Sequence, residues 1–336
     1  VSLAAAGRSV AVLTIDPAPR LLDALGLSDQ EDAVHDVPLN GVRAAARNGA
    51  RGRLSAMRLD PKSTFDAVVR KYAPSGSAAD AILGNRIYRN LSNALAGVGD
   101  YMAMEKLVAL DEDRANDVIV LDTPPAQEAL EFLDAPRRLL DLLDSRAVSL
   151  LSAPAGLMRS GLGVLDTAAR AVLKAFDRAT GINLLPDIQA FVRSFDGMYP
   201  GFAARARRAQ ELLRATETAV VLVTTPEDIR VEQAREFADA LASADLKIAA
   251  IVVNRVMPEL PNANELRTAR VAEALKRKLL QNLRDYQTLK RREARSLKRL
   301  RDALRGDARL LIAPELGREP RKLTDLLELA QSLEPA

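Results

Sequence analysis

Short apolar runs alternate along the chain with longer stretches in which apolar residues recur at helical spacing. A short apolar run that is bounded by turn-forming residues is typical of a strand buried on both faces of a parallel sheet. Residues 28–53 are polar and contain glycine, which is typical of a loop. Strands alternating with helices predict an α/β fold with a doubly wound, mainly parallel sheet. The predicted strands lie at residues 10–15, 54–59, 118–121, 219–224, 248–253 and 309–313.

Two helical regions, residues 63–110 and 127–215, are too long to be simple crossovers between neighbouring strands. We therefore expect both regions to form a discontinuous α-helical subdomain that is inserted into the sheet domain. The α/β domain then comprises residues 1–62, 111–126 and 216–336.

One predicted strand, Val118–Leu121, ends in Asp122 and is followed at once by Thr123, Pro124 and Pro125. Open α/β sheets bind their ligands at the carboxyl ends of the strands, which is where this carboxylate lies. In P-loop NTPases an aspartate at this position fixes Mg²⁺, directly or through water. The alternative is that Asp122 serves only to begin a turn.

A second predicted strand, residues 10–15, ends in the same way, with Asp16 followed by Pro17. Parallel strands present their carboxyl ends at one edge of the sheet, so Asp16 and Asp122 can face a single ligand. Phosphoryl transfer needs one group that holds a metal and another that orients the attacking water. The pair fits that division of roles, although two turn or N-cap aspartates would give the same pattern.

The composition, 48% hydrophobic and 28% charged residues, is that of a globular protein with enough apolar residues for a large core. No uninterrupted apolar stretch reaches the roughly 18 residues of a membrane span, and no signal peptide is visible. Cysteine is absent, which excludes a disulfide framework, a thiolate metal site and a cysteine nucleophile. We expect a cytoplasmic protein without a transmembrane segment.

Positive charge is concentrated in one segment. Residues 267–305 contain fourteen Lys or Arg and four Asp or Glu, a balance of +10, so the rest of the chain sums to −7 (3 minus 10). The segment is predicted to be an amphipathic helix whose cations form a solvated face or meet an anionic partner, which could be an acidic protein, a lipid headgroup or nucleic acid. Aromatic residues are nearly absent there, which argues against base stacking and against a specific nucleic-acid partner.

Several motifs together resemble one known family. Residues 14–18 read Thr-Ile-Asp-Pro-Ala, residues 122–125 read Asp-Thr-Pro-Pro, residues 224–227 read Thr-Thr-Pro-Glu, and residues 252–255 read Val-Val-Asn-Arg. In this order they resemble the arsenical-pump (ArsA-type) ATPases and their relatives that target tail-anchored membrane proteins. These are SIMIBI-type P-loop NTPases. The segments at 101–107 and 132–136 are most similar to an actinobacterial branch whose members are thought to work as paired paralogues.

The resemblance implies roles at the phosphate end of an ATP or ADP site. Asp16, with Pro17 beside it, would orient or activate the attacking water. Asp122 would hold Mg²⁺ through water. The γ-phosphate would be sensed by the next three residues, Thr123, Pro124 and Pro125.

The resemblance also implies a base-binding end. Asn254 would select adenine, with Arg255 next to it, and Pro314 and Glu315 would flank the base.

Two departures from the family pattern are visible. No Gly-x-x-x-x-Gly-Lys-[Ser/Thr] loop occurs in the 336 residues. The family places that loop just upstream of the helix that Val1–Ala6 would finish, so we expect the sequence to start after it. No Cys-x-x-Cys pair occurs either, so a zinc-bridged dimer is not implied, and arsenite binding by thiolates is excluded.

Three functions follow as hypotheses. The first is an ATP-hydrolysing switch protein that works as a homodimer or as a heterodimer with a paralogous ATPase. The second is a non-hydrolysing scaffold subunit that binds nucleotide and serves such a paralogue. The third is a chaperone for a protein client, namely a tail-anchored membrane protein. For the third, the leucines between residues 139 and 165 would have to form an open groove rather than ordinary helical core.

Overall fold

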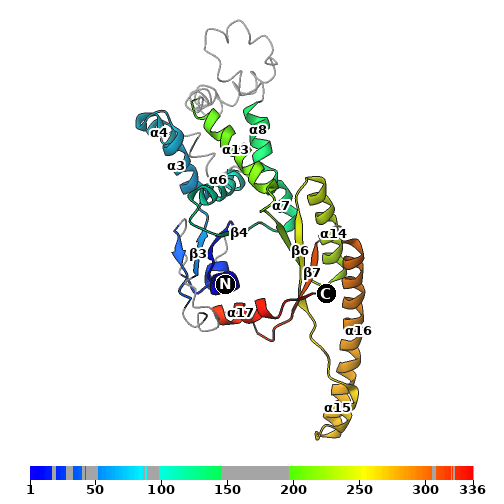
Figure 1. The fold of residues 1–336 in the computed structure, drawn as a ribbon. Helices are drawn as coiled ribbons and strands as arrows, with labels where there is room; N and C mark the ends of the chain where they lie inside the picture. The colour runs from blue at the N-terminus through cyan, green and yellow to red at the C-terminus, as the bar shows by residue number, and fades with distance from the viewer. Residues whose placement is uncertain are drawn as a thin grey trace, which may run out of the picture.

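The computed structural model contains two four-stranded sheets and the helices that cover them (Figure 1). It describes residues 1–16, 20–27, 33–39, 42, 52–85, 88, 98–144, 197–304, 308–318, 320 and 322–335. Pro17 and the leucine-rich segment 145–165 lie outside these ranges. Within them, no helix combines the length and the apolar character needed to cross a membrane.

The first sheet has the strand order β2-β3-β1-β4. Its three longer strands are parallel, and the two-residue strand β2 pairs antiparallel with β3 at one edge. Thr14, the last residue of β1, is aligned with Arg58 of β3 on one side and with Asp122 of β4 on the other. The strands are β1 (Ser9–Thr14), β2 (His35–Asp36), β3 (Arg53–Arg58) and β4 (Val118–Asp122).

The second sheet has the order β5-β6-β7-β8, with three parallel strands and a short antiparallel strand at the β8 edge. The strands are β5 (Val220–Thr224), β6 (Ile248–Val256), β7 (Arg309–Pro314) and β8 (Glu334–Pro335).

Helices cover both sheets, and α3 has clear start signals. Asp60 caps α3 by accepting hydrogen bonds from the amides of Lys62 and Ser63, with Pro61 in the first turn. The helices before residue 145 are α1 (Ser2–Ala5), α2 (Arg20–Ala24), α3 (Pro61–Tyr72), α4 (Gly76–Leu83), α6 (Val98–Asp113), α7 (Ala126–Leu133) and α8 (Ala135–Leu143). Those after it are α13 (Tyr199–Arg214), α14 (Asp228–Ser243), α15 (Ala263–Thr268), α16 (Glu273–Ala303) and α17 (Leu323–Gln331).

Three hydrophobic clusters hold the layers together. The largest joins one face of the first sheet to α3, α4, α6 and α13. A second joins the other face of that sheet to α1 and α2, with α17 packed against it. The third joins β5, β6 and β7 to α14 and α16. Helix α7 belongs to two of them, because Phe132 is buried in the first cluster and Ala129 in the third.

Helices α6 and α13 are joined by a buried ion pair as well as by apolar contacts. Arg205 of α13 donates from Nε to both carboxylate oxygens of Glu105 on α6, each at 2.9 Å. Both side chains are buried, and the Arg205 guanidinium also contacts Glu112, two turns further along α6. Because a buried charge is costly unless it is paired, this contact fixes α13 against α6 in one position.

The predicted α/β class is confirmed, and every predicted strand is present with limits shifted by a few residues. Two differences have a physical reason. Short strand β2 lies in the segment predicted as loop, since His35 and Asp36 pair with the edge of β3. The predicted single sheet is divided, because β4 and β5 each pair with only one neighbour among the described strands.

Strands β4 and β5, each unpaired on one side among the described strands, also expose apolar side chains on a face. Val120 of β4 is 42% exposed, and Val221 and Val223 of β5 are 54% and 62% exposed. Strands of parallel sheets are normally covered on both faces and paired on both sides. The two sheets are linked instead by helices, with α7 on one side and α17 on the other (Figure 1).

Candidate functional site

Thr14 connects the two aspartates that the sequence singles out. Its side chain is buried at the carboxyl end of β1. The Thr14 Oγ1 donates a hydrogen bond to Asp122 Oδ2 at 2.9 Å and accepts one from the Asp16 backbone N–H at 3.2 Å. The Ile15 amide also bonds to the Asp122 carbonyl at 3.4 Å. One hydroxyl therefore joins the Asp122 carboxylate at the end of β4 to the backbone of Asp16 just after β1.

The loop after Asp122 leads directly into a helix. Thr123 is exposed and its Oγ1 donates to the Pro124 carbonyl at 3.3 Å. Pro125 is the N-cap residue of α7, and its carbonyl accepts from the amides of Glu128 and Ala129 at 2.9 and 3.0 Å. A displacement of this loop must therefore move the start of α7.

The second sheet supplies the predicted base-binding residues, but in a different local structure. Strand β6 does not end at Val253 as predicted; it continues through Asn254 and Arg255 to Val256. An irregularity lies between Val253 and Val256, because Val253 pairs with Ile312 while Val256 pairs with Pro314. Arg255 takes up the extra residue in the left-handed region, at φ 58°.

This irregularity places Asn254 and Arg255 beside the end of β7. The Asn254 Oδ1 accepts the Arg255 amide at 2.9 Å, and the Glu315 amide donates to the Val256 carbonyl at 2.8 Å. Asn254, Arg255, Pro314 and Glu315 are thus brought together at the carboxyl edge of the second sheet.

Further carboxylates adjoin that edge. A hydrogen bond from the Thr225 side chain, helped by Arg230 and Arg255, lowers the pKa of Glu227, which precedes α14. Burial raises the pKa of Glu293 on α16, against the opposing hydrogen bond that it accepts from the Met257 amide at 3.2 Å. Glu227 and Glu315 also raise the Glu293 pKa by charge repulsion, so the three carboxylates lie near one another.

The Asp122 carboxylate fits a magnesium ion held through water. The Thr14 hydroxyl donates to Asp122 Oδ2. Asp122 is exposed, and among the described residues no hydrogen bond uses its Oδ1. Among the described residues, no group of three or more His, Asp or Glu side chains could hold a metal alone. Mg²⁺ bound to a nucleotide needs only one or two carboxylates, because water and phosphate oxygens complete its octahedral shell.

Sequence reasoning missed three residues near the site. Thr14 was recognised in the sequence only as part of a motif, because its pairing with Asp122 across β1 and β4 is a long-range contact. Glu227 follows Thr-Thr-Pro and directly precedes α14, and acidic residues are favoured at the start of a helix. Glu293 carries no signal, because only the packing of α16 brings it to the edge of the second sheet.

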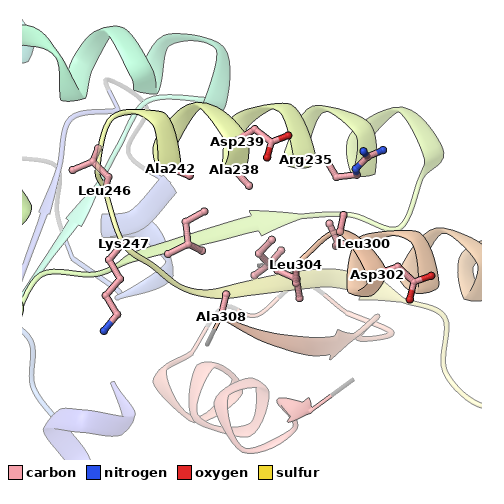
Figure 2. A pocket seen from close by; sticks show the side chains of 13 residues that line it. Arg235, Ala238, Asp239, Ala242, Leu246, Lys247, Leu300, Asp302, Leu304 and Ala308 are labelled. Carbon is pink, nitrogen blue, oxygen red and sulfur yellow. The ribbon is translucent and has the colours of Figure 1, made fainter. Parts of the chain in front are cut away.

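One cavity of about 430 Å³ lies elsewhere, between α14, the start of β6 and the end of α16 (Figure 2). Its floor is aliphatic, including Leu246, Ile251 and Leu300. Its rim carries charges of both signs, among them Arg235 and Asp302. The cavity is at the amino end of β6, whereas Asn254 is near the carboxyl end, so it is separate from the candidate site.

Comparison with known proteins agrees with this geometry. The profile of the anion-transporting ATPase (ArsA ATPase) family matches residues 1–306. An ATPase ASNA1 homolog of Trypanosoma cruzi is 26% identical over 286 residues, which cover 81% of this chain and 70% of the relative. An ATPase GET3 of Phaeosphaeria nodorum is 26% identical over 274 residues, which cover 80% and 74%. An uncharacterised protein of Streptomyces coelicolor is 27% identical over 224 residues, which cover 65% and 51%.

The matched family consists of P-loop NTPases, so the α/β fold is that of a nucleotide-binding protein of this class. Within that class, the chain belongs to the anion-transporting ATPase family. The predicted family resemblance is confirmed.

Proposed function

We propose that the protein is a cytoplasmic, Mg²⁺-dependent ATPase that works as a dimeric switch. The observation that carries the proposal is the hydroxyl of Thr14, which joins Asp16 and Asp122 in one group at the carboxyl edge of the first sheet. Family membership supports ATP as the nucleotide. The dimer, as a homodimer or with a paralogue, rests on the family resemblance alone.

At the phosphate end, the two aspartates have different roles. Asp122 would hold the Mg²⁺ of the bound nucleotide through water, and that ion would neutralise charge on the phosphate oxygens. Asp16 would orient the attacking water, from a backbone position that Thr14 fixes. Thr123, Pro124 and Pro125 would sense the γ-phosphate, because they lie directly between Asp122 and α7.

At the base end, Asn254 would bind adenine through its amide group. Its Oδ1 already accepts the Arg255 amide, and a carbonyl oxygen has a second lone pair for the adenine amino group. The Asn254 Nδ2 can donate to a ring nitrogen. Pro314 and Glu315 would flank the base from the end of β7.

A phosphate-binding loop is the remaining requirement. We propose that a further parallel strand lies between β4 and β5 and carries such a loop at its carboxyl end. The support is the pair of unpaired apolar edges, where Val120, Val221 and Val223 are exposed. Such a strand would cover these side chains and bring the two ends of the site together.

Helix α7 would transmit the nucleotide state. It starts at the γ-phosphate loop and packs against two different cores, through Phe132 toward the helical subdomain and through Ala129 toward α14. A shift at Pro125 on hydrolysis would therefore change how the helical subdomain sits relative to the second sheet. A protein client, including a tail-anchored membrane protein, would respond to that movement.

The test is Asp16→Asn in the natural full-length protein. Loss of the carboxylate should reduce steady-state ATP hydrolysis by about 10²- to 10⁴-fold, because a positioned base contributes that much, while ATP affinity stays within about twofold. Phosphate release measures the rate of ATP hydrolysis, and titration with a fluorescent nucleotide measures the affinity. Asp36→Asn, on an exposed aspartate paired with Arg53, is the matched control and should change neither. Unchanged hydrolysis in Asp16→Asn would overturn the assignment.

A non-hydrolysing scaffold subunit paired with a paralogue is the second candidate. It predicts that a co-expressed paralogue supplies all the activity. In that case only substitution of the paralogue's phosphate-loop lysine would abolish hydrolysis, and Asp16→Asn in this chain would have no effect.

A further inference from the structure

Helix α16 carries one apolar stripe along its whole length. The stripe positions follow one another at steps of three or four residues, which keeps them on one face. The apolar positions are Leu275, Leu279, Tyr286, Leu289, Leu297, Leu300 and the C-cap residue Leu304, and the polar residues Asn282 and Glu293 interrupt them on the same face.

The carboxyl-terminal half of the stripe is covered by the protein. Leu300 is buried in the core of the second sheet, and Leu297 and Leu304 pack against the same core. Ser296 and Arg299 both contact Asp228, at the start of α14, which fixes this half of the helix to its neighbour.

The amino-terminal half of the same stripe is open to solvent. Leu275, Tyr286 and Leu289 are 47%, 51% and 45% exposed. Figure 1 shows this half of α16, with α15 at its tip, extending away from both sheets. Leu283, on the neighbouring face, is buried. The amino-terminal half of the helix is therefore partly packed, although Leu275, Tyr286 and Leu289 of its stripe are exposed.

Positive charge surrounds the open half. Arg277, Lys278 and Arg284 are exposed, and the structure gives them no ion pair within the described residues. Lys278 borders the stripe, because it lies three residues after Leu275 and four before Asn282. The two arginines lie on the polar face. Apolar residues on one face, cations on the other and low overall hydrophobicity characterise helices that lie in the surface of a membrane.

We propose that the amino-terminal half of α16 binds the surface of an anionic lipid bilayer. Charge complementarity selects this partner, since residues 273–289 carry four Lys or Arg against two Asp or Glu, and residues 267–305 as a whole carry a balance of +10. A second copy of the helix is a poorer partner, because it would bring two positively charged segments together. Nucleic acid would find only Tyr286 for stacking in this segment. In a bilayer surface, Leu275 and Leu289 bury apolar area about 21 Å apart along the helix, and Tyr286 takes the interfacial position.

The test is sedimentation of the full-length protein with lipid vesicles. Binding is expected to phosphatidylcholine vesicles that contain about one-third phosphatidylglycerol, with at least about tenfold weaker binding to phosphatidylcholine alone and a decline as salt rises. Leu275→Asp combined with Leu289→Asp should weaken binding by about tenfold or more. Arg277→Gln, Lys278→Gln and Arg284→Gln together should do the same, whereas Val34→Asp, at an exposed apolar residue elsewhere, should have no effect.

Circular dichroism melts establish that the substituted proteins are folded, which is expected because every substituted side chain is exposed. Absence of binding to the anionic vesicles overturns the proposal, and so does equal binding to neutral ones. If the double leucine variant binds vesicles normally but loses an acidic protein partner, the stripe is a protein-docking surface and the membrane proposal is wrong.

Discussion

The phosphate end and the base end of the candidate site are built in different ways. At the first sheet, a buried hydroxyl joins regular strands, and the register between Thr14 and Asp122 sets the geometry. At the second sheet, an irregular strand with Arg255 in the left-handed region sets the geometry. The first end depends on one side chain and the second on backbone conformation. The two ends should therefore respond differently to substitution.

Thr14→Val should have the largest effect and should act on turnover. Valine fills the same buried space but removes the hydroxyl that holds Asp122 and the Asp16 amide. Hydrogen bonds to charged groups contribute about 1.5–3 kcal/mol, so we expect single-turnover ATP hydrolysis to fall by roughly 10- to 100-fold. Thr14→Ser should restore most of the rate.

The control for this experiment is Thr218→Val. Thr218 lies between α13 and β5, and its hydroxyl donates to the carbonyl of Leu212 in α13. This substitution should lower stability slightly and leave the rate unchanged. Equal rates for Thr14→Val and the wild type would mean that the hydroxyl does not organise the phosphate end.

Arg255→Gly should have a smaller effect and should act on stability. A left-handed conformation costs an L-residue about 1–2 kcal/mol, and glycine avoids this cost. We expect the denaturant midpoint to rise, with a gain of up to about 1 kcal/mol, and Arg255→Val to lower it. Asp245→Gly, at φ 60° in the turn after α14, is the matched reference. If Arg255→Gly destabilises the protein, the arginine side chain matters more than the backbone strain.

Glu227→Gln should have the smallest effect, visible as a pH dependence of stability. The pKa of Glu227 is lowered in the folded state, chiefly by the Thr225 side chain. A lowered carboxyl pKa contributes stability above the unfolded value of about 4.3, and this contribution is lost as pH falls through the folded pKa. Wild type should be more stable than Glu227→Gln at neutral pH, and the difference should vanish in acid. A difference that persists in acid would point to another cause.

Sequence reasoning predicted the regular part of the molecule well. Buried strands such as Val118–Asp122 are specified by local apolar runs, and the observed limits differ from the predicted ones by only a few residues. It failed at Asn254, where the strand continues through an irregularity, because the pairing of Val256 with Pro314 is a long-range contact. Glu293 was missed for the same reason, since only the docking of α16 brings it beside Met257.

The division of the chain into an α/β domain and an inserted helical subdomain stays a prediction. The packing of α3, α6 and α13 into one core is consistent with it. That core also includes Leu13 and Met57 from the first sheet, so apolar packing alone does not separate the two units.

The central claim is that the ends of both sheets form one ATP site, and photolabelling tests it most directly. Full-length protein should be irradiated with 8-azido-ATP and Mg²⁺, digested and analysed by mass spectrometry. The account predicts label on the peptides that contain Asn254 or Glu315, with labelling prevented by excess ATP. Label confined to other peptides, such as those lining the cavity between α14 and α16, would contradict it.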